Sequence, residues 1–236
     1  MVNSLNMALM KTLLMEDHFM EHAFGLAIPT TLEEVCDPKR LALVVYDMQV
    51  GILSQIKNGE QILFRVLQVL QAARAAGMRI FFSRHMGLPK ELMGVSQLRV
   101  AMEWQHVDSI EQVQPRFLRD TPPFQLVPEL SPLPREAIFD KITMSAFEGT
   151  WLDIALRDCG VNAIAIMGVA MEVGIEPTAR HAADLGYIPV IVTDACGAGN
   201  EEAARRSLAS LEFAGYALMT DVQTICRTFQ HLQRAG

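Results

Sequence analysis

The sequence predicts an α/β fold of three layers, α/β/α, in which a six-stranded, mainly parallel sheet lies between two layers of helices. Two observations lead to this fold class. Six short apolar runs alternate along the chain with longer segments whose apolar residues recur at helical spacing. The apolar runs are also continuous, a pattern typical of strands that are covered on both faces. We expect strands at residues 41–46, 78–83, 136–140, 162–169, 188–193 and 216–219.

The expected helices follow from the spacing of apolar residues and from glycine. In residues 60–76, Ile62, Val66 and Val69 lie on one helical face, and Gly77 ends the helix. Strand, helix and strand then form one right-handed βαβ unit. The other helices are expected at residues 90–103, 150–159, 172–185, 201–213 and 222–234.

Two segments depart from this repeat. Between Arg84 and Pro134 the sequence contains six prolines and one expected helix, so we interpret this insert as a lid or a dimer contact. Residues 1–28 are predicted to be an N-terminal extension or an oligomerisation arm, because Met1–Phe24 shows a loose helical periodicity. A frayed tail or an upstream start codon fits the same pattern. Thr30–Glu34 is expected to form a capped turn that leads into one domain, residues 29–236.

The composition indicates a small-molecule ligand. The net charge is -7 and no run is rich in Lys or Arg, which argues against nucleic acid or an anionic membrane as the main partner. No apolar run approaches the ~18 residues that span a bilayer, and the N-terminus lacks the features of a signal peptide. The four cysteines are far apart and show neither zinc-site nor disulfide spacing. We therefore predict a soluble protein of the reducing cytoplasm.

The candidate site lies at the carboxyl ends of the strands, where open α/β sheets bind ligands. Asp47 and Lys141 each fall at such an end, and the strand-to-helix turn that contains Gly168, Ala170 and Gly174 forms the expected floor. Small residues there let a ligand approach the backbone, although they are also typical of ordinary packing. An Asp/Lys pair at this edge can transfer a proton or can be a structural ion pair.

Several separated motifs strongly resemble the isochorismatase-like hydrolase superfamily. They are Leu41-Ala-Leu-Val-Val-Tyr-Asp-Met-Gln49, Phe139-Asp-Lys-Ile-Thr-Met-Ser-Ala-Phe147, Gly168-Val-Ala-Met-Glu-Val-Gly-Ile-Glu-Pro-Thr-Ala-Arg-His-Ala182 and Val192-Thr-Asp-Ala195, in order between about residues 31 and 224. The resemblance implies a Rossmann-like, homo-oligomeric hydrolase, a dimer or tetramer, with an Asp, Lys, Cys triad that cleaves amides through a thioester. Asp47 and Lys141 match the first two members of that triad, whereas the Cys position falls on Gly174.

Gly174 leaves the expected triad without a nucleophile, because glycine has no side chain and no acyl-enzyme can form there. True isochorismatases, as the resemblance implies, also place Gly at this position. They use the Asp to protonate a vinyl ether to which water then adds. We therefore expect Asp47 to act as a general acid while Lys141 positions the substrate.

The sequence of residues 172–181 is more similar to the amidase branch of this superfamily, so three alternative interpretations stay open. One is hydrolysis of an amide, ester or carbamate by water that Asp47 activates. Another is a catalytically silent relative that binds a ligand or scaffolds an oligomer. A third is that Gly174 replaces a native cysteine.

Further residues are predicted to line the site. The resemblance implies a cis peptide at Val169–Ala170 that aims the Ala170 and Gly174 amides into the pocket. Gln49, His85, Glu172 and Phe147 are candidate substrate contacts, with loop capping for Gln49 and core packing for Phe147 as alternatives. Ser83-Arg84-His85 supplies only one of the ligands that nicotinamidase-type relatives use, so we predict no metal and no cofactor.

Overall fold

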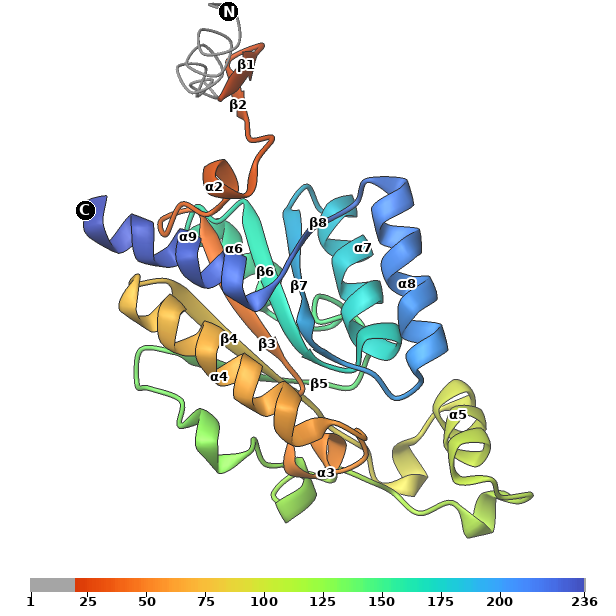
Figure 1. Cartoon of the computed structure of the whole chain (residues 1–236). Coiled ribbons are helices and arrows are strands. Elements are labelled where there is room, and N and C mark those ends of the chain that lie inside the picture. The colour runs from red at the N-terminus through yellow and green to blue at the C-terminus, as the bar shows by residue number, and fades with distance from the viewer. Residues whose placement is uncertain (1–19, 236) are drawn as a thin grey trace, which may run out of the picture.

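A six-stranded parallel sheet with the strand order β5-β4-β3-β6-β7-β8 lies at the centre of the structure (Figure 1), a computed structural model that describes residues 20–235. All five neighbouring pairs are parallel, which confirms the predicted fold class. The chain order reverses between β3 and β6, and such a switch point is where ligands bind in open sheets. The strands are β3 Leu41–Tyr46, β4 Arg79–His85, β5 Ala137–Lys141, β6 Ala163–Val169, β7 Ile188–Gly197 and β8 Leu218–Thr220.

Helices cover both faces of the sheet. The side chains of β3 point alternately to the two faces and pack in two apolar clusters. Leu41, Leu43 and Val45 pack in one cluster with α4 (Gly59–Ala75) and α9 (Val222–Ala235). Ala42, Val44 and Tyr46 pack in the other, with α6 (Leu152–Asp158), α7 (Glu176–Asp184) and α8 (Glu201–Ala214). All six residues of β3 are buried, as the continuous apolar run predicted.

Two expected helices are divided. Residues 172–185 form a π-helical turn, η5 (Met171–Ile175), followed by α7, which begins at Glu176 with Pro177 in its first turn. Proline suits the start of a helix because its missing N–H has no partner there in any case. Residues 90–103 form a 3-10 turn (Lys90–Leu92) and then α5 (Val95–Gln105).

The insert is mostly irregular, and it packs on the sheet only in part: Val127 and Leu130 belong to the apolar cluster of β3 and α4. Figure 1 shows α5 projecting from the body, and α5 buries none of its side chains within the described part of the chain. The rest of the insert holds three further 3-10 turns, Ile110–Gln112, Pro122–Phe124 and Pro128–Leu130. A short helix, α3 (Val50–Leu53), precedes α4.

The helical periodicity expected for Met1–Phe24 is wrong for residues 21–24, whereas their role as an extension or arm stays a prediction. Residues 21–28 form a hairpin of β1 (Glu21–Ala23) and β2 (Leu26–Ile28), because Phe24 and Gly25 have φ angles of 52° and 79° and turn the chain back. The helical periodicity expected for residues 1–19 lies outside the described residues. The capped turn is confirmed as α2 (Leu32–Val35), in which Thr31 and Glu34 form a capping box. Within residues 20–235, no helix has the length and apolar character that crossing a membrane requires.

Candidate active site

Asp47 is turned out of the strand that precedes it. It directly follows β3 and has a φ of 45°, a conformation that Asp tolerates better than most residues. Its backbone N–H donates to Ser83 Oγ at 3.1 Å, and Ser83 Oγ in turn donates to Asp47 Oδ1 at 2.6 Å. Ser83 lies on β4, the neighbouring strand, and is fully buried. The two contacts hold the Asp47 carboxylate over the carboxyl end of β4.

Lys141 reaches the same carboxylate from β5, one strand further away. Its Nζ donates to Asp47 Oδ2 at 2.7 Å and to the carbonyl oxygen of Thr143 at 3.1 Å. The Lys141 side chain is 0% exposed and that of Asp47 is 6% exposed. A buried pair of this kind is costly to separate, because the remaining partner is left as an uncompensated charge. The structure thus brings together the two residues that the sequence singled out.

The burial of this cluster shifts the pKa values of its basic groups. Desolvation lowers the pKa of Lys141, and the charge of Asp47 opposes that shift. His85 ends β4, and burial, followed by the charge of Lys141, lowers its pKa. The His85 ring contacts Phe117 edge-on at 6.3 Å between centroids. Its Nδ1 is buried and has no hydrogen-bond partner among the described residues.

Gly174 lies in η5, beneath the side chain of Tyr46. A Cβ built on Gly174 would come closer than 3.0 Å to the Oη, Cε1 and Cζ atoms of Tyr46. The Tyr46 ring lies against Lys141, with Nζ 4.3 Å from its centroid, and its hydroxyl donates to the carbonyl oxygen of Met144. Burial, and then the charge of Asp47, raise the pKa of Tyr46 well above its usual value, so the hydroxyl stays a neutral phenol.

The turn before Gly174 agrees only in part with the prediction. The peptide Val169–Ala170 is cis, as expected. The Gly174 N–H, however, donates to the Ala170 carbonyl oxygen at 3.0 Å. The expectation that this amide points into a pocket is therefore wrong, because the π-helical turn uses it internally.

The other predicted contact residues lie around the cluster in mainly packed positions. Gln49 is fully buried, and its Oε1 accepts from the His85 backbone N–H at 2.6 Å. Its Nε2 donates to the carbonyl oxygens of His85 (3.0 Å) and Phe124 (2.7 Å). Phe147 is 6% exposed and stacks on Tyr187, with 5.6 Å between ring centroids. Both side chains thus hold loops in place.

Glu172 faces the loop between β7 and α8. Its Oε1 accepts from the Asn200 N–H at 2.7 Å, whereas its Oε2 is buried without a partner among the described residues. The structure gives no contact between Glu172 and the Asp47–Lys141 pair. Glu172 therefore remains a candidate contact only for a ligand that extends toward this loop.

Three residues of the cluster were missed in the sequence. They are Ser83 and Tyr46, described above, and Thr178, whose Oγ1 donates to the Gly174 carbonyl oxygen at 2.7 Å and accepts from the Ala146 N–H at 3.0 Å. Tyr46 and Ser83 are hydroxyl groups inside apolar buried strands, and Thr178 is a buried hydroxyl group on α7. That pattern is a usable signal, because buried polar side chains require partners.

No thiol takes the place of a nucleophile in this cluster. Burial raises the pKa of Cys196 to about 12, and burial together with Glu33 does the same for Cys36. Burial also raises the pKa of Cys226. These three residues are therefore thiols rather than reactive thiolates at neutral pH. Within residues 20–235, no three or more His, Cys, Asp or Glu side chains gather in a group that could hold a metal.

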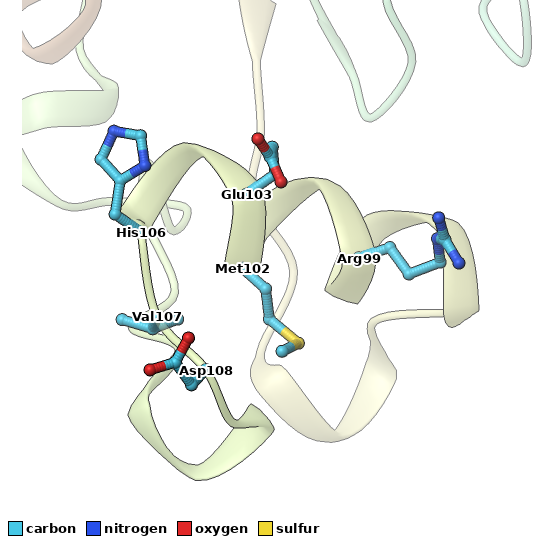
Figure 2. A pocket seen from close by; sticks show the side chains of 6 residues that line it. All are labelled: Arg99, Met102, Glu103, His106, Val107 and Asp108. Carbon is cyan, nitrogen blue, oxygen red and sulfur yellow. The ribbon is translucent and has the colours of Figure 1, made fainter.

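Two surface pockets lie away from the cluster. One, of about 520 Å³, is on the insert, and Figure 2 shows that its lining comes from α5 and the turn after it: Arg99, Met102, Glu103, His106, Val107 and Asp108. The other, of about 490 Å³, lies between Glu33 and α9. Neither is lined by Asp47 or Lys141, whose side chains are buried by their own neighbours.

Comparisons with known proteins agree with this fold. The family model of the isochorismatase domain matches residues 41–224. Ureidoacrylate amidohydrolase RutB of Acinetobacter baylyi is 26% identical over 215 residues, which cover 84% of this chain and 86% of that protein. The chain therefore belongs to the isochorismatase family. Homologues in this family, such as RutB and pyrazinamidase/nicotinamidase, are hydrolases, and on that basis the chain is a hydrolase.

Solved structures share the fold at lower identity. A cysteine hydrolase from Pseudomonas syringae pv. phaseolicola superposes with a TM-score of 0.72 at 24% identity, covering 84% of this chain and 96% of that one. A pyrazinamidase/nicotinamidase from Streptococcus mutans gives a TM-score of 0.62 at 24% identity, covering 76% and 99%. These matches support the three-layer architecture.

Proposed function

We propose that this chain hydrolyses a small molecule by direct attack of water, with Asp47 as the base and without a covalent intermediate. The observation that carries the proposal is that both Asp47 oxygens accept short hydrogen bonds, from Ser83 (2.6 Å) and from Lys141 (2.7 Å). An ionised carboxylate accepts two such bonds and still has lone pairs for the proton of a water molecule. It therefore suits the role of a base better than that of an acid.

Gly174 supports direct attack by water. The resemblance puts this residue where related hydrolases carry their cysteine, and Cys36, Cys196 and Cys226, which lie elsewhere, have raised pKa values. The ammonium group of Lys141 then stabilises the negative charge that develops when water adds to a carbonyl group. The amidohydrolase relative favours a small amide, ester or carbamate as the substrate.

Two other functions are each favoured by a specific observation. Gly174 favours hydrolysis of a vinyl ether, as in the isochorismatases that the sequence resembles, with Asp47 as the acid. The near-complete burial of Asp47 and Lys141 favours a relative that binds a ligand without turnover.

The test is a hydrolysis screen of small amides, ureides, carbamates, esters and isochorismate with wild type and Asp47→Asn. We expect Asp47→Asn to lower kcat/KM by a factor of about 10²–10⁴ with little change in KM, because a general base contributes this much. Asp140→Asn is the matched control. Asp140 directly precedes Lys141 on β5, but its carboxylate accepts from Arg84 Nε at 2.8 Å and is not part of the Asp47–Lys141 pair.

The substrate that is turned over separates the candidates. Hydrolysis of an amide, ureide, carbamate or ester supports Asp47 as the base, whereas hydrolysis of isochorismate alone supports Asp47 as the acid. An Asp47→Asn variant as active as Asp140→Asn contradicts the proposal. Ligand binding that survives Asp47→Asn, with no turnover by wild type of any substrate screened, favours the silent relative instead.

A further inference from the structure

Tyr46 fills a space that matters for the chemistry of this site. It is the last residue of β3, 2% exposed, and its ring lies between Lys141 and the backbone of Gly174. We propose that Tyr46 occupies the volume of the side chain that position 174 lacks, and that Tyr46 and Gly174 form a matched pair. Tyr46 is then the residue that excludes a nucleophile from this site.

The ring has little freedom to make room for a side chain. Its hydroxyl is bonded to the Met144 carbonyl oxygen. The backbone of Tyr46 is held from the other side by Gly168, whose φ is 127° and where a Cβ would come closer than 3.0 Å to Tyr46 main-chain atoms. Because interiors are close-packed, any side chain at position 174 must displace a ring that is fixed at both ends.

The Tyr46 ring also contacts the ammonium group of Lys141. Lys141 Nζ lies 4.3 Å from the ring centroid, where the electron-rich face of an aromatic ring attracts a cation. Truncation of Tyr46 therefore opens space above Gly174 directly beside the ammonium group. A thiol introduced there would be stabilised as a thiolate by Lys141.

The first test is a thermal double-mutant cycle with Tyr46→Val and Gly174→Cys. We expect Gly174→Cys alone to lower the midpoint of unfolding by about 3–10 °C, because overpacking a core has an effect of this size in a chain of this length. The double variant is expected to lose clearly less than the sum of the two single losses. If Gly174→Cys does not fold, the cycle is run with Gly174→Ala.

The matched control is Tyr187→Val combined with Gly174→Cys. Tyr187 is also a buried tyrosine (5% exposed), but its hydroxyl donates to Asp153, and the three atoms nearest to a Cβ built at position 174 all belong to Tyr46. We expect additive losses in this control. Additive losses for Tyr46→Val and Gly174→Cys as well would overturn the proposal.

The second test is alkylation by iodoacetamide, in which the thiolate sulfur forms a C–S bond and iodide leaves. Peptide mass spectrometry resolves the new thiol at position 174 from exposed Cys159, an internal reference, and from buried Cys36, which reacts only on unfolding. We expect alkylation at position 174 to be at least tenfold faster in Tyr46→Val/Gly174→Cys than in Gly174→Cys. Equal rates with Cys36 protected would contradict the proposal.

The statement that position 174 is the place of a catalytic nucleophile rests on the proposed function. The two tests of the Tyr46–Gly174 pair use no substrate. An inactive wild type in the hydrolysis screen therefore leaves the pairing of Tyr46 with Gly174 intact. Additive thermal losses would remove the pairing and leave the role of Asp47 untouched.

Discussion

His85 couples the candidate site to folding through its lowered pKa. The unfolded chain binds a proton at this residue near pH 6.5, while the folded chain resists it because burial and Lys141 disfavour the imidazolium ion. The contribution of His85 to stability is therefore complete above pH 6.5. It is lost as the pH falls from 6.5 toward the folded-state pKa, with a slope of up to ~1.4 kcal/mol per pH unit.

We predict that His85→Asn flattens the free energy of unfolding between pH 7 and 5.5, measured by urea denaturation. This window lies above the titration of ordinary carboxyl groups. His106→Asn is the control, because His106 is exposed at the end of α5, where its φ of 52° suits Asn. A slope that persists in His85→Asn and disappears in His106→Asn would contradict this account.

Single residues of the site differ in how far the sequence reveals them. Asp47 and Lys141 could be predicted, because each ends a recognisable apolar strand and lies in a specific motif. Tyr46 could not, because its contact with Gly174 depends on how β3 lies over η5, and only coordinates give that relation. Gln49 was expected as a ligand contact, but its amide is already bonded to backbone groups on either side.

The sheet was predictable because its central strands, β3 and β6, are buried along their whole length, and because helices such as α4 show one apolar face. The six strands fall within a few residues of their expected positions. The β1–β2 hairpin was missed because its three-residue strands are too short to show a period. The π-helical turn η5 was missed because its apolar spacing resembles the start of an ordinary helix.

At the scale of the whole molecule, the insert exposes several large apolar side chains. The insert carries Leu92, Val95 and Trp104 at 67%, 79% and 57% exposure, although soluble monomers seldom expose large apolar patches. The resemblance noted in the sequence predicts a homo-oligomer, and we propose that the insert provides its contact surface. We expect sedimentation equilibrium to give a mass of two or four times 26.2 kDa.

Val95→Ser combined with Trp104→Ser should lower that mass, because the variant removes apolar area from the insert. Phe213→Ser is the control, since Phe213 is 93% exposed on α8, outside the insert. A monomeric wild type would contradict the prediction. So would dissociation by Phe213→Ser while the insert variant remains assembled.

The most direct measurement compares kcat/KM, on the best substrate of the screen, for wild type, Asp47→Asn and a variant in which Cys36, Cys159, Cys196 and Cys226 are all alanine. A reaction that uses water and Asp47 predicts that the variant without cysteines keeps its rate within about twofold, while Asp47→Asn loses a factor of about 10² or more. Loss of activity on removal of the cysteines, with Asp47→Asn still active, would show that a thiol performs the chemistry.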